Sequence, residues 1–218
     1  MLRLPTPCLL LVTDRSLCPI NISYPEYLNQ LVDAGVNAIQ IREKDLATKQ
    51  LLSLTQDIQE VINKKALLMV NDRLDIALAC NLDGVQISEN GFPVELAREL
   101  SGENLLLGRS VHNVTGAVEA EASGADFLIA GTIFKSTSHP ESLPAGLQLL
   151  EQINRAVALP CLAIGGITVE NVQDVMRAGA SGIALISAIQ GTADPETVAQ
   201  DLRNAMASEF QRNERLNT

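Results

Sequence analysis

Two kinds of segment alternate along the whole sequence, and this alternation limits the folds that the chain can adopt. One kind is a short apolar run rich in β-branched residues, which is typical of a parallel strand covered on both faces. The other is a longer stretch with apolar residues every three or four positions, which is typical of an amphipathic helix. The strand-like runs are residues 9–12, 38–41, 67–70, 84–87, 105–107, 127–130, 161–164 and 183–186. The helix-like stretches are residues 24–34, 48–64, 72–80, 93–100, 115–123, 147–157, 169–178 and 196 to about 210.

This regular alternation predicts an α/β fold. Because no composition break divides the 218 residues, we expect a single domain over residues 1–218, a closed (β/α)8 TIM barrel. An open doubly wound sheet is the alternative that shares the alternation. A barrel of this length has short connections, and the exception is the polar segment 134–146; loops of this length commonly serve in binding. The tail, about residues 211–218, is expected to be disordered.

Charge and composition exclude several classes of function. The formal net charge is −10 and aromatic residues make up 3%, so we expect neither nucleic-acid binding nor aromatic stacking platforms. A small anionic substrate needs only a local basic pocket and is not excluded. The four cysteines show no CxxC spacing, which predicts reduced thiols and no zinc site, with Cys8 and Cys161 in the core. No apolar run is long enough for a signal peptide or a membrane span, which predicts a cytoplasmic protein.

Polar residues recur where the predicted strands end. In a TIM barrel the chemistry lies at the carboxyl ends of the strands, so these positions predict one shared site. Helix capping is the alternative at each position, for example at Asn71 or Asp72 before the helix that begins near Leu74. The polar candidates are Gln40, Arg42, Lys44, Asn71, Gln86, Arg109, Ser110, His112 and Ser187.

Two consecutive glycines, Gly165 and Gly166, follow the seventh apolar run. Glycines let the backbone approach a ligand closely and offer N–H donors, and Ser187 follows the neighbouring strand. The loops after strands seven and eight are the recurrent phosphate site of TIM barrels, so this pair predicts a substrate that bears a phosphate. Tight turns without a ligand are the alternative.

The sequence has two histidines, His112 and His139. His112 lies just past a strand end, close to Arg109, where its side chain would face the mouth of the barrel. An imidazole that titrates near neutrality suits proton transfer, although a structural role is the alternative. His139 lies in the long polar loop and has no assigned role.

Six motifs resemble the thiamine phosphate synthase/TenI superfamily and cover nearly the whole chain in order. The resemblance implies a TIM barrel that acts in thiamine biosynthesis on a phosphorylated heterocycle. The motifs are LVTDR (11–15), QIREK (40–44), NDRLDIA (71–77), GRSVH (108–112), AIGGI (163–167) and GASGIALISAI (179–189).

One branch of this superfamily, thiamine phosphate synthase, joins an aminopyrimidine methyl pyrophosphate to a thiazole phosphate with the help of Mg²⁺. Its site for the pyrimidine and the pyrophosphate resembles Gln40, Arg42, Lys44 and Asn71 here, and Asp72 matches one of its magnesium ligands.

Two departures count against the synthase branch. Gly91 stands where its second magnesium-binding Asp is expected, and a Mg²⁺ site with one carboxylate in place of two is weakened. The loop after strand six reads Ser136-Thr137-Ser138-His139 where the synthase has Thr-x-Thr-Lys. The missing lysine removes positive charge from the place where pyrophosphate develops.

The other branch, TenI, is similar to thiazole tautomerase, which moves a proton on a carboxylated thiazole phosphate without a metal. Residues 108–112 match its GRSVH motif, and residues 85–87 resemble its fourth strand. This resemblance makes His112 the proton shuttle, with Arg42 or Arg109 at the carboxylate. The remaining residues expected to bind this substrate are Gln40, Lys44, Asn71, Gln86, Ser110, Ser136, Ser138, Gly165, Gly166, Ile186 and Ser187.

We therefore expect a tautomerase that needs no cofactor. The alternatives are a synthase with a modified Mg²⁺ site at Asp72, a related enzyme on another phosphorylated heterocycle, and a non-catalytic regulatory barrel. The expected partners are a phosphorylated thiazole and, in a homodimer, a second copy of the chain; nucleic acid and membrane are not expected.

Overall fold

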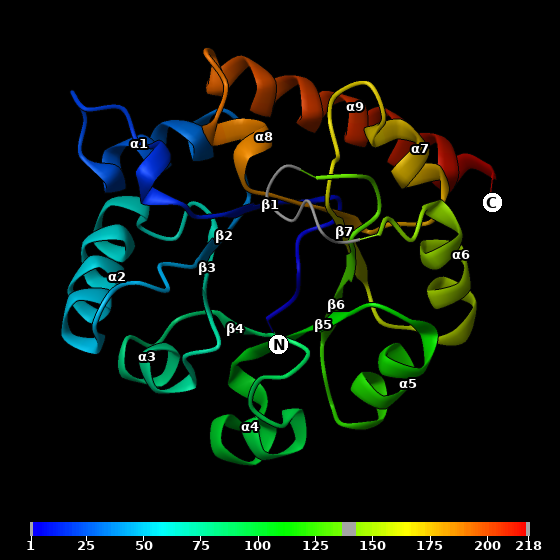
Figure 1. The fold of residues 1–218 in the computed structure, drawn as a ribbon, viewed down its shortest axis with the longest axis horizontal. Coiled ribbons are helices and arrows are strands. Elements are labelled where there is room, and N and C mark those ends of the chain that lie inside the picture. Colours follow the sequence, from blue (N-terminus) through cyan, green and yellow to red (C-terminus); the bar gives the residue numbers. More distant parts are fainter. Residues whose placement is uncertain (1, 137–142, 217–218) are drawn as a thin grey trace.

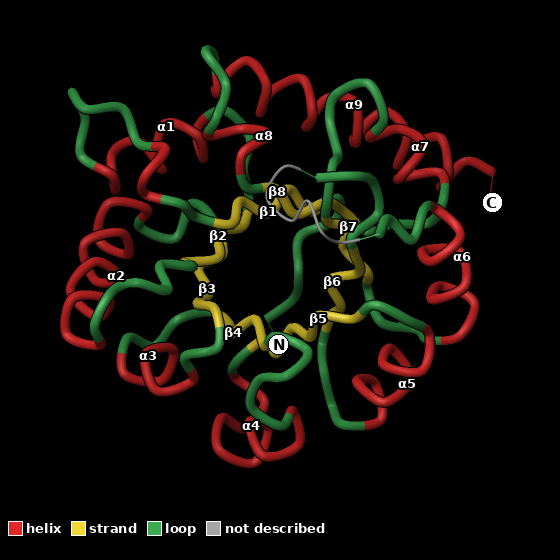
Figure 2. Tube along the Cα trace, in the orientation of Figure 1, coloured by secondary structure: helices red, strands yellow, loops and turns green. Residues whose placement is uncertain are grey.

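Each apolar run forms a parallel strand, and hydrogen bonds between neighbours close the eight strands into a barrel in chain order (Figures 1 and 2). The computed structural model describes residues 2–136 and 143–216. The TIM barrel is thereby confirmed, and the open sheet is excluded because β1 pairs with β8. The strands are β1 (Cys8–Val12), β2 (Ala38–Ile41), β3 (Leu67–Asn71), β4 (Gly84–Ile87), β5 (Leu106–Val111), β6 (Phe127–Gly131), β7 (Cys161–Ile164) and β8 (Gly182–Leu185).

The helices surround the barrel and bury their apolar faces against it (Figure 2). Several begin at residues that satisfy free backbone N–H groups; Ser23, for example, accepts a hydrogen bond from the backbone of Glu26. The helices are α1 (Tyr24–Asp33), α2 (Thr48–Ile62), α3 (Leu74–Ala79), α4 (Val94–Ser101), α5 (Val114–Ala122), α6 (Leu147–Ala156), α7 (Val172–Arg177), α8 (Ser187–Gln190) and α9 (Pro195–Leu216), with short 3-10 turns η1 (Arg15–Leu17) and η2 (Gly102–Asn104).

The differences from the sequence prediction that matter most concern three elements. Strand β5 continues to Val111, past the expected end at Leu107. The short helix α8 follows β8 where only a connection was expected. Helix α9 continues to Leu216, past the end expected near Phe210, so the tail is helical to that residue.

The strand residues alternate between two cores. One set points outward and packs beneath the helices, and the other fills the inside of the barrel. Leu4, on the segment before β1, packs against this inner cluster. The inner residues are Cys8, Leu10, Val12, Ala38, Met69, Leu106, Phe127, Ile129, Leu162 and Ala184. Polar residues at the next inward positions toward the carboxyl ends therefore face the mouth of the barrel.

The cysteines are all unpaired, and Cys8 and Cys161 are buried in the core as predicted. Among the described residues, no helix is both long and apolar enough to cross a bilayer.

Candidate active site

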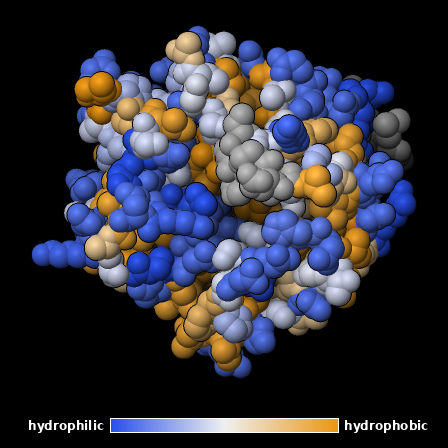
Figure 3. Space-filling view, viewed as in Figure 1, coloured by the Kyte–Doolittle hydropathy of each residue, from blue (hydrophilic) through white to orange (hydrophobic). Residues whose placement is uncertain are grey.

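A cavity of about 600 Å³ opens at the carboxyl ends of the strands. The centre of the barrel is hollowed in the space-filling view, and hydrophilic residues form much of its rim (Figure 3). Its size is within the range of cavities that hold small ligands. The cavity brings together twelve of the residues predicted for the site: Gln40, Arg42, Lys44, Asn71, Gln86, Ser110, His112, Ser136, Gly165, Gly166, Ile186 and Ser187.

One side of the cavity is built by β2 and β3. Gln40 is an inward residue of β2, and its Nε2 donates to Oδ1 of Asn71 at 2.8 Å. The Gln40 Oε1 atom is buried without a hydrogen-bond partner among the described residues, so it can accept a hydrogen bond from a ligand. Arg42 and Lys44 follow β2 and bring two positive charges to the same side.

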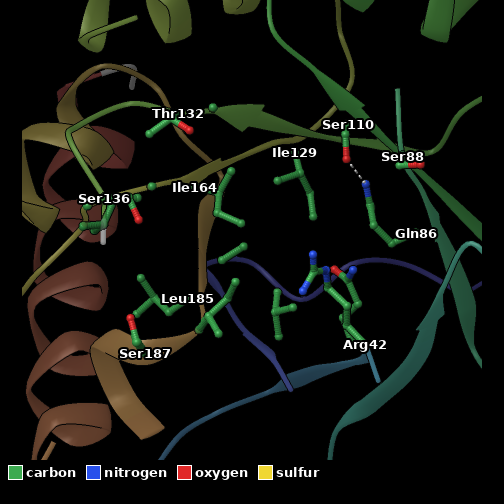
Figure 4. Close-up of a pocket in the computed structure, with 18 of the residues that line it drawn as sticks. Arg42, Gln86, Ser88, Ser110, Ile129, Thr132, Ser136, Ile164, Leu185 and Ser187 are labelled. Carbon is green, nitrogen blue, oxygen red and sulfur yellow. Dashed lines mark hydrogen bonds between the residues drawn. The ribbon is translucent and has the colours of Figure 1, made fainter. Parts of the chain in front are cut away.

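The next part of the wall comes from β4 and β5. The Nε2 of Gln86 donates to Oγ of Ser110 at 3.1 Å, as Figure 4 shows. Gly108 makes room for this amide, because a Cβ atom at position 108 would collide with the Gln86 Oε1 and the Phe127 ring. The Gln86 Oε1 atom is also buried without a partner.

The opposite side is formed by the loops after β6, β7 and β8. Gly165 and Gly166 have φ of 102° and 63°, a region that favours glycine. A Cβ atom at position 166 would collide with the Lys135 carbonyl oxygen, so the two loops approach each other closely only because this residue is glycine. Ser187 begins α8 beside them, and Figure 4 shows Ser136 and Ser187 across the cavity from Arg42.

His112 lies at the rim and pairs with an acidic side chain. Its Nδ1 is 3.1 Å from Oε2 of Glu89, and both side chains are about half exposed. A carboxylate on one ring nitrogen orients the imidazole and favours a proton on that nitrogen. The pair can therefore present the other ring nitrogen for proton transfer.

Arg109 does not line the cavity, in contrast to the sequence prediction. It is an outward residue of β5, because Ser110 and Gly108 on either side of it face inward. Its guanidinium donates to backbone carbonyl oxygens of the loop after β4: to Ser88 at 2.9 Å, to Glu89 at 2.7 Å and to Phe92 at 3.4 Å. Arg109 thus holds the loop that carries Glu89.

Asp72 is the one predicted magnesium ligand, and it lines a smaller adjoining pocket of about 320 Å³. Its Oδ1 accepts from the Ser88 backbone at 2.7 Å, and its Oδ2 accepts from Asn71 at 2.9 Å. A Cβ atom at Gly91 would lie 2.7 Å from Asp72 Oδ1, so a side chain at position 91 would require Asp72 to move from its present place. Within residues 2–136 and 143–216, no three His, Cys, Asp or Glu side chains are grouped for a metal ion. The residues therefore do not fit a two-carboxylate Mg²⁺ site; an ion here would depend on Asp72 and on substrate oxygens.

Some cavity residues were not among the substrate-binding residues expected from the sequence. Lys135, Thr132 and Ser88 line the cavity. Lys135 lies in the long loop whose polarity did indicate binding, and it adds a positive charge on the side of Gly166 and Ser187. Ser138 and His139 lie outside the described residues.

Comparison with known proteins identifies the family. The family model described as thiamine monophosphate synthase matches residues 9–189. The chain belongs to this family of thiamine-biosynthesis enzymes. It is 39% identical over 196 residues to the thiamine-phosphate synthase of Pyrococcus horikoshii, covering 89% of this chain and 92% of that protein. It is 43% identical over 176 residues to the thiamine-phosphate synthase of Methanoculleus marisnigri, covering 80% and 83%.

A solved structure gives the same result at the level of the fold. The thiamine phosphate pyrophosphorylase from Pyrococcus furiosus superposes with a TM-score of 0.84 at 35% identity, covering 93% of this chain and 96% of that one. The family predicted from the motifs is thereby confirmed. The names of these relatives favour the synthase branch, so they do not support the prediction that placed the chain closest to TenI.

Proposed function

We propose that this protein is a thiamine phosphate synthase, which joins an aminopyrimidine methyl pyrophosphate to a thiazole phosphate and releases pyrophosphate. The observation that carries the proposal is that one cavity has two polar sides. Arg42 and Lys44 lie on one side, and Gly166 and Ser187 lie on the other. Two phosphorylated substrates need two such places, whereas isomerisation of one phosphorylated thiazole needs one.

The β2 side suits the pyrimidine pyrophosphate. Arg42 and Lys44 can stabilise the negative charge that develops on the departing pyrophosphate. The unpartnered Oε1 of Gln40 can accept a hydrogen bond from the amino group of the pyrimidine. Asn71 orients Gln40 through the bond between their amides.

The loops after β6, β7 and β8 suit the thiazole phosphate. Gly165 and Gly166 present backbone N–H groups, Ser136 and Ser187 add hydroxyls, and Lys135 adds a positive charge. The apolar side chains of Ile129 and Ile164 lie between the two sides and can contact the thiazole ring (Figure 4).

A second candidate, thiazole tautomerase, is favoured by the contact between His112 and Glu89. A histidine oriented by a carboxylate at the rim of a phosphate-binding cavity is suited to move a proton. Gly91 favours the same candidate, because it removes a carboxylate that the synthase chemistry is expected to use.

Both activities can be measured on the same preparation. The protein is incubated with both synthase substrates and Mg²⁺, and separately with the carboxylated thiazole phosphate tautomer. We expect formation of thiamine phosphate, and we expect Lys44→Ala to lower kcat/KM by about tenfold or more because charge at the leaving group is lost. Lys65→Ala is the matched control, because Lys65 pairs with Asp33 on the outer surface.

The opposite result would assign the second candidate. If no thiamine phosphate forms and the tautomer is converted, the synthase proposal is wrong. That conversion should then be lost in His112→Ala; a fully active variant would remove His112 from the mechanism.

A further inference from the structure

Glu43 lies between the two cations of the β2 side, Arg42 and Lys44, but its carboxylate does not line the main cavity. Its side chain is only 4% exposed. A buried carboxylate is costly unless it is paired and hydrogen bonded, so its partners indicate what it holds in place.

The partners of Glu43 come from the connection after β1. The hydroxyl of Thr13 donates to Oε1 of Glu43 at 2.6 Å. The guanidinium of Arg15 donates to Oε2 at 2.9 Å, and the Arg15 backbone N–H donates to both oxygens at 3.2 and 3.4 Å. The carboxylate therefore joins the turn after β2 to the turn after β1.

Thr13 connects Glu43 to the backbone of Arg42. Thr13 is fully buried, and its Oγ1 accepts the backbone N–H of Arg42 at 2.9 Å. A hydroxyl has one proton, and because that proton is given to Glu43 a lone pair is left for Arg42. The charge on Glu43 thus sets the orientation of the hydroxyl that holds the Arg42 backbone.

We infer that Glu43 is a positioning residue, whose buried carboxylate fixes Arg42 and Lys44 at the cavity for binding of the substrate pyrophosphate. This inference rests on the proposed function, in which those two cations bind pyrophosphate. Glu43→Gln keeps the shape of the side chain but turns one acceptor into a donor. At the Oε1 position that donor faces the Arg15 backbone N–H, and at the Oε2 position it faces the Arg15 guanidinium. Two donors then face each other in either orientation, so the contact between the two turns is weakened.

The test is the affinity of the full-length protein for inorganic pyrophosphate, measured by calorimetry without added metal. We expect Glu43→Gln and Thr13→Val each to weaken binding about tenfold, because a small displacement of Arg42 and Lys44 is enough to lose their geometry around the pyrophosphate. Thr13→Ser keeps the hydroxyl and should bind as the unmodified protein does. Asp45→Asn is the matched control, since Asp45 is the exposed second partner of Arg15.

A double-mutant cycle separates positioning from a general loss of structure. In a background that carries Arg42→Ala and Lys44→Ala, Glu43→Gln should weaken binding no further, since it acts through those residues. An additional loss of the same size as in the unmodified protein would overturn the inference. Thermal unfolding is followed for every variant, and Thr13→Val and Thr13→Ser decide the question if Glu43→Gln does not fold.

The inference and the proposed function fail in different ways. The proposed pyrophosphate site is wrong if the variant with Arg42→Ala and Lys44→Ala binds pyrophosphate as tightly as the unmodified protein, or if the unmodified protein binds none. In either case the inference about Glu43 is wrong as well. If that double variant binds measurably more weakly while Glu43→Gln and Thr13→Val bind as tightly as the unmodified protein, only the role of Glu43 is wrong.

Discussion

Arg109 affects this site through the backbone of a neighbouring loop. Its guanidinium contacts three carbonyl oxygens of residues 88–92, and the same loop places Glu89 against His112. The residue was predicted to bind substrate because it was assigned to a strand end. Strand β5 extends to Val111, and the alternation of side chains along it turns Arg109 outward and Ser110 inward. The apolar run in the sequence stops at Leu107, so the extension of the strand that sets this direction is given only by the folded barrel.

The role of Arg109 predicts a loss of stability when its side chain is removed. We expect Arg109→Ala to lower the free energy of unfolding by about 1.5–3 kcal/mol, the range for hydrogen bonds made by a charged group. Urea unfolding measures this loss. Arg155→Ala is the control, because the Arg155 side chain is 78% exposed and pairs with Glu151 one helical turn away. If the Arg109→Ala protein is as stable as the unmodified protein but no longer binds substrate, Arg109 binds the substrate directly and the structural role is wrong.

At the scale of elements, the phosphate side of the cavity depends on how closely the loop after β7 approaches the loop after β6. Gly166 lies against the carbonyl oxygen of Lys135, and the Gly165 carbonyl accepts the backbone N–H of Phe134 at 3.0 Å. The sequence indicated the two glycines as a phosphate site. It did not show that their lack of a side chain also joins two loops that lie about thirty residues apart.

This packing predicts the effect of a single methyl group. Gly166→Ala should lower the free energy of unfolding by about 1–3 kcal/mol, through the strained φ and the collision with Lys135, and it should weaken binding of the thiazole phosphate. Gly124→Ala is the control, since Gly124 also has a positive φ, of 88°, but no atom lies closer than 3.9 Å to an added Cβ. Equal losses in the two variants would show that the collision contributes nothing.

At the scale of the whole molecule, closure of the barrel builds the cavity. The pairing of β8 with β1 brings Ser187 and the residues after β2 to one mouth, although the chain between them forms the rest of the barrel. The same closure buries Cys8 inside the barrel, and Cys161 is buried in the core beneath the helices.

Burial of these thiols predicts a loss of stability in alkali. Burial raises the pKa of the Cys161 thiol to about 12 and also raises that of Cys8. The thiols ionise near pH 8.5 in the unfolded chain, so their contribution to stability is complete below that pH and is lost as the pH rises toward the folded pKa. Between about pH 8.5 and pH 10, ionisation of each of these thiols in the unfolded chain should lower the free energy of unfolding by about 2 kcal/mol. Urea unfolding of Cys161→Ala should show a smaller decrease over this range; an equal decrease would contradict the assignment.

The sequence by itself determined the barrel, its family and most positions of the cavity. These follow from local patterns: the spacing of apolar runs, the glycines after β7 and the polar residues at strand ends such as Gln40 and Asn71. Only the tertiary structure decided that Arg109 faces outward, that Glu43 is held by Thr13, and that Gly91 packs against the carboxylate of Asp72. These are contacts between segments that lie far apart in the chain, and their geometry depends on strand register and barrel closure, which no local pattern encodes.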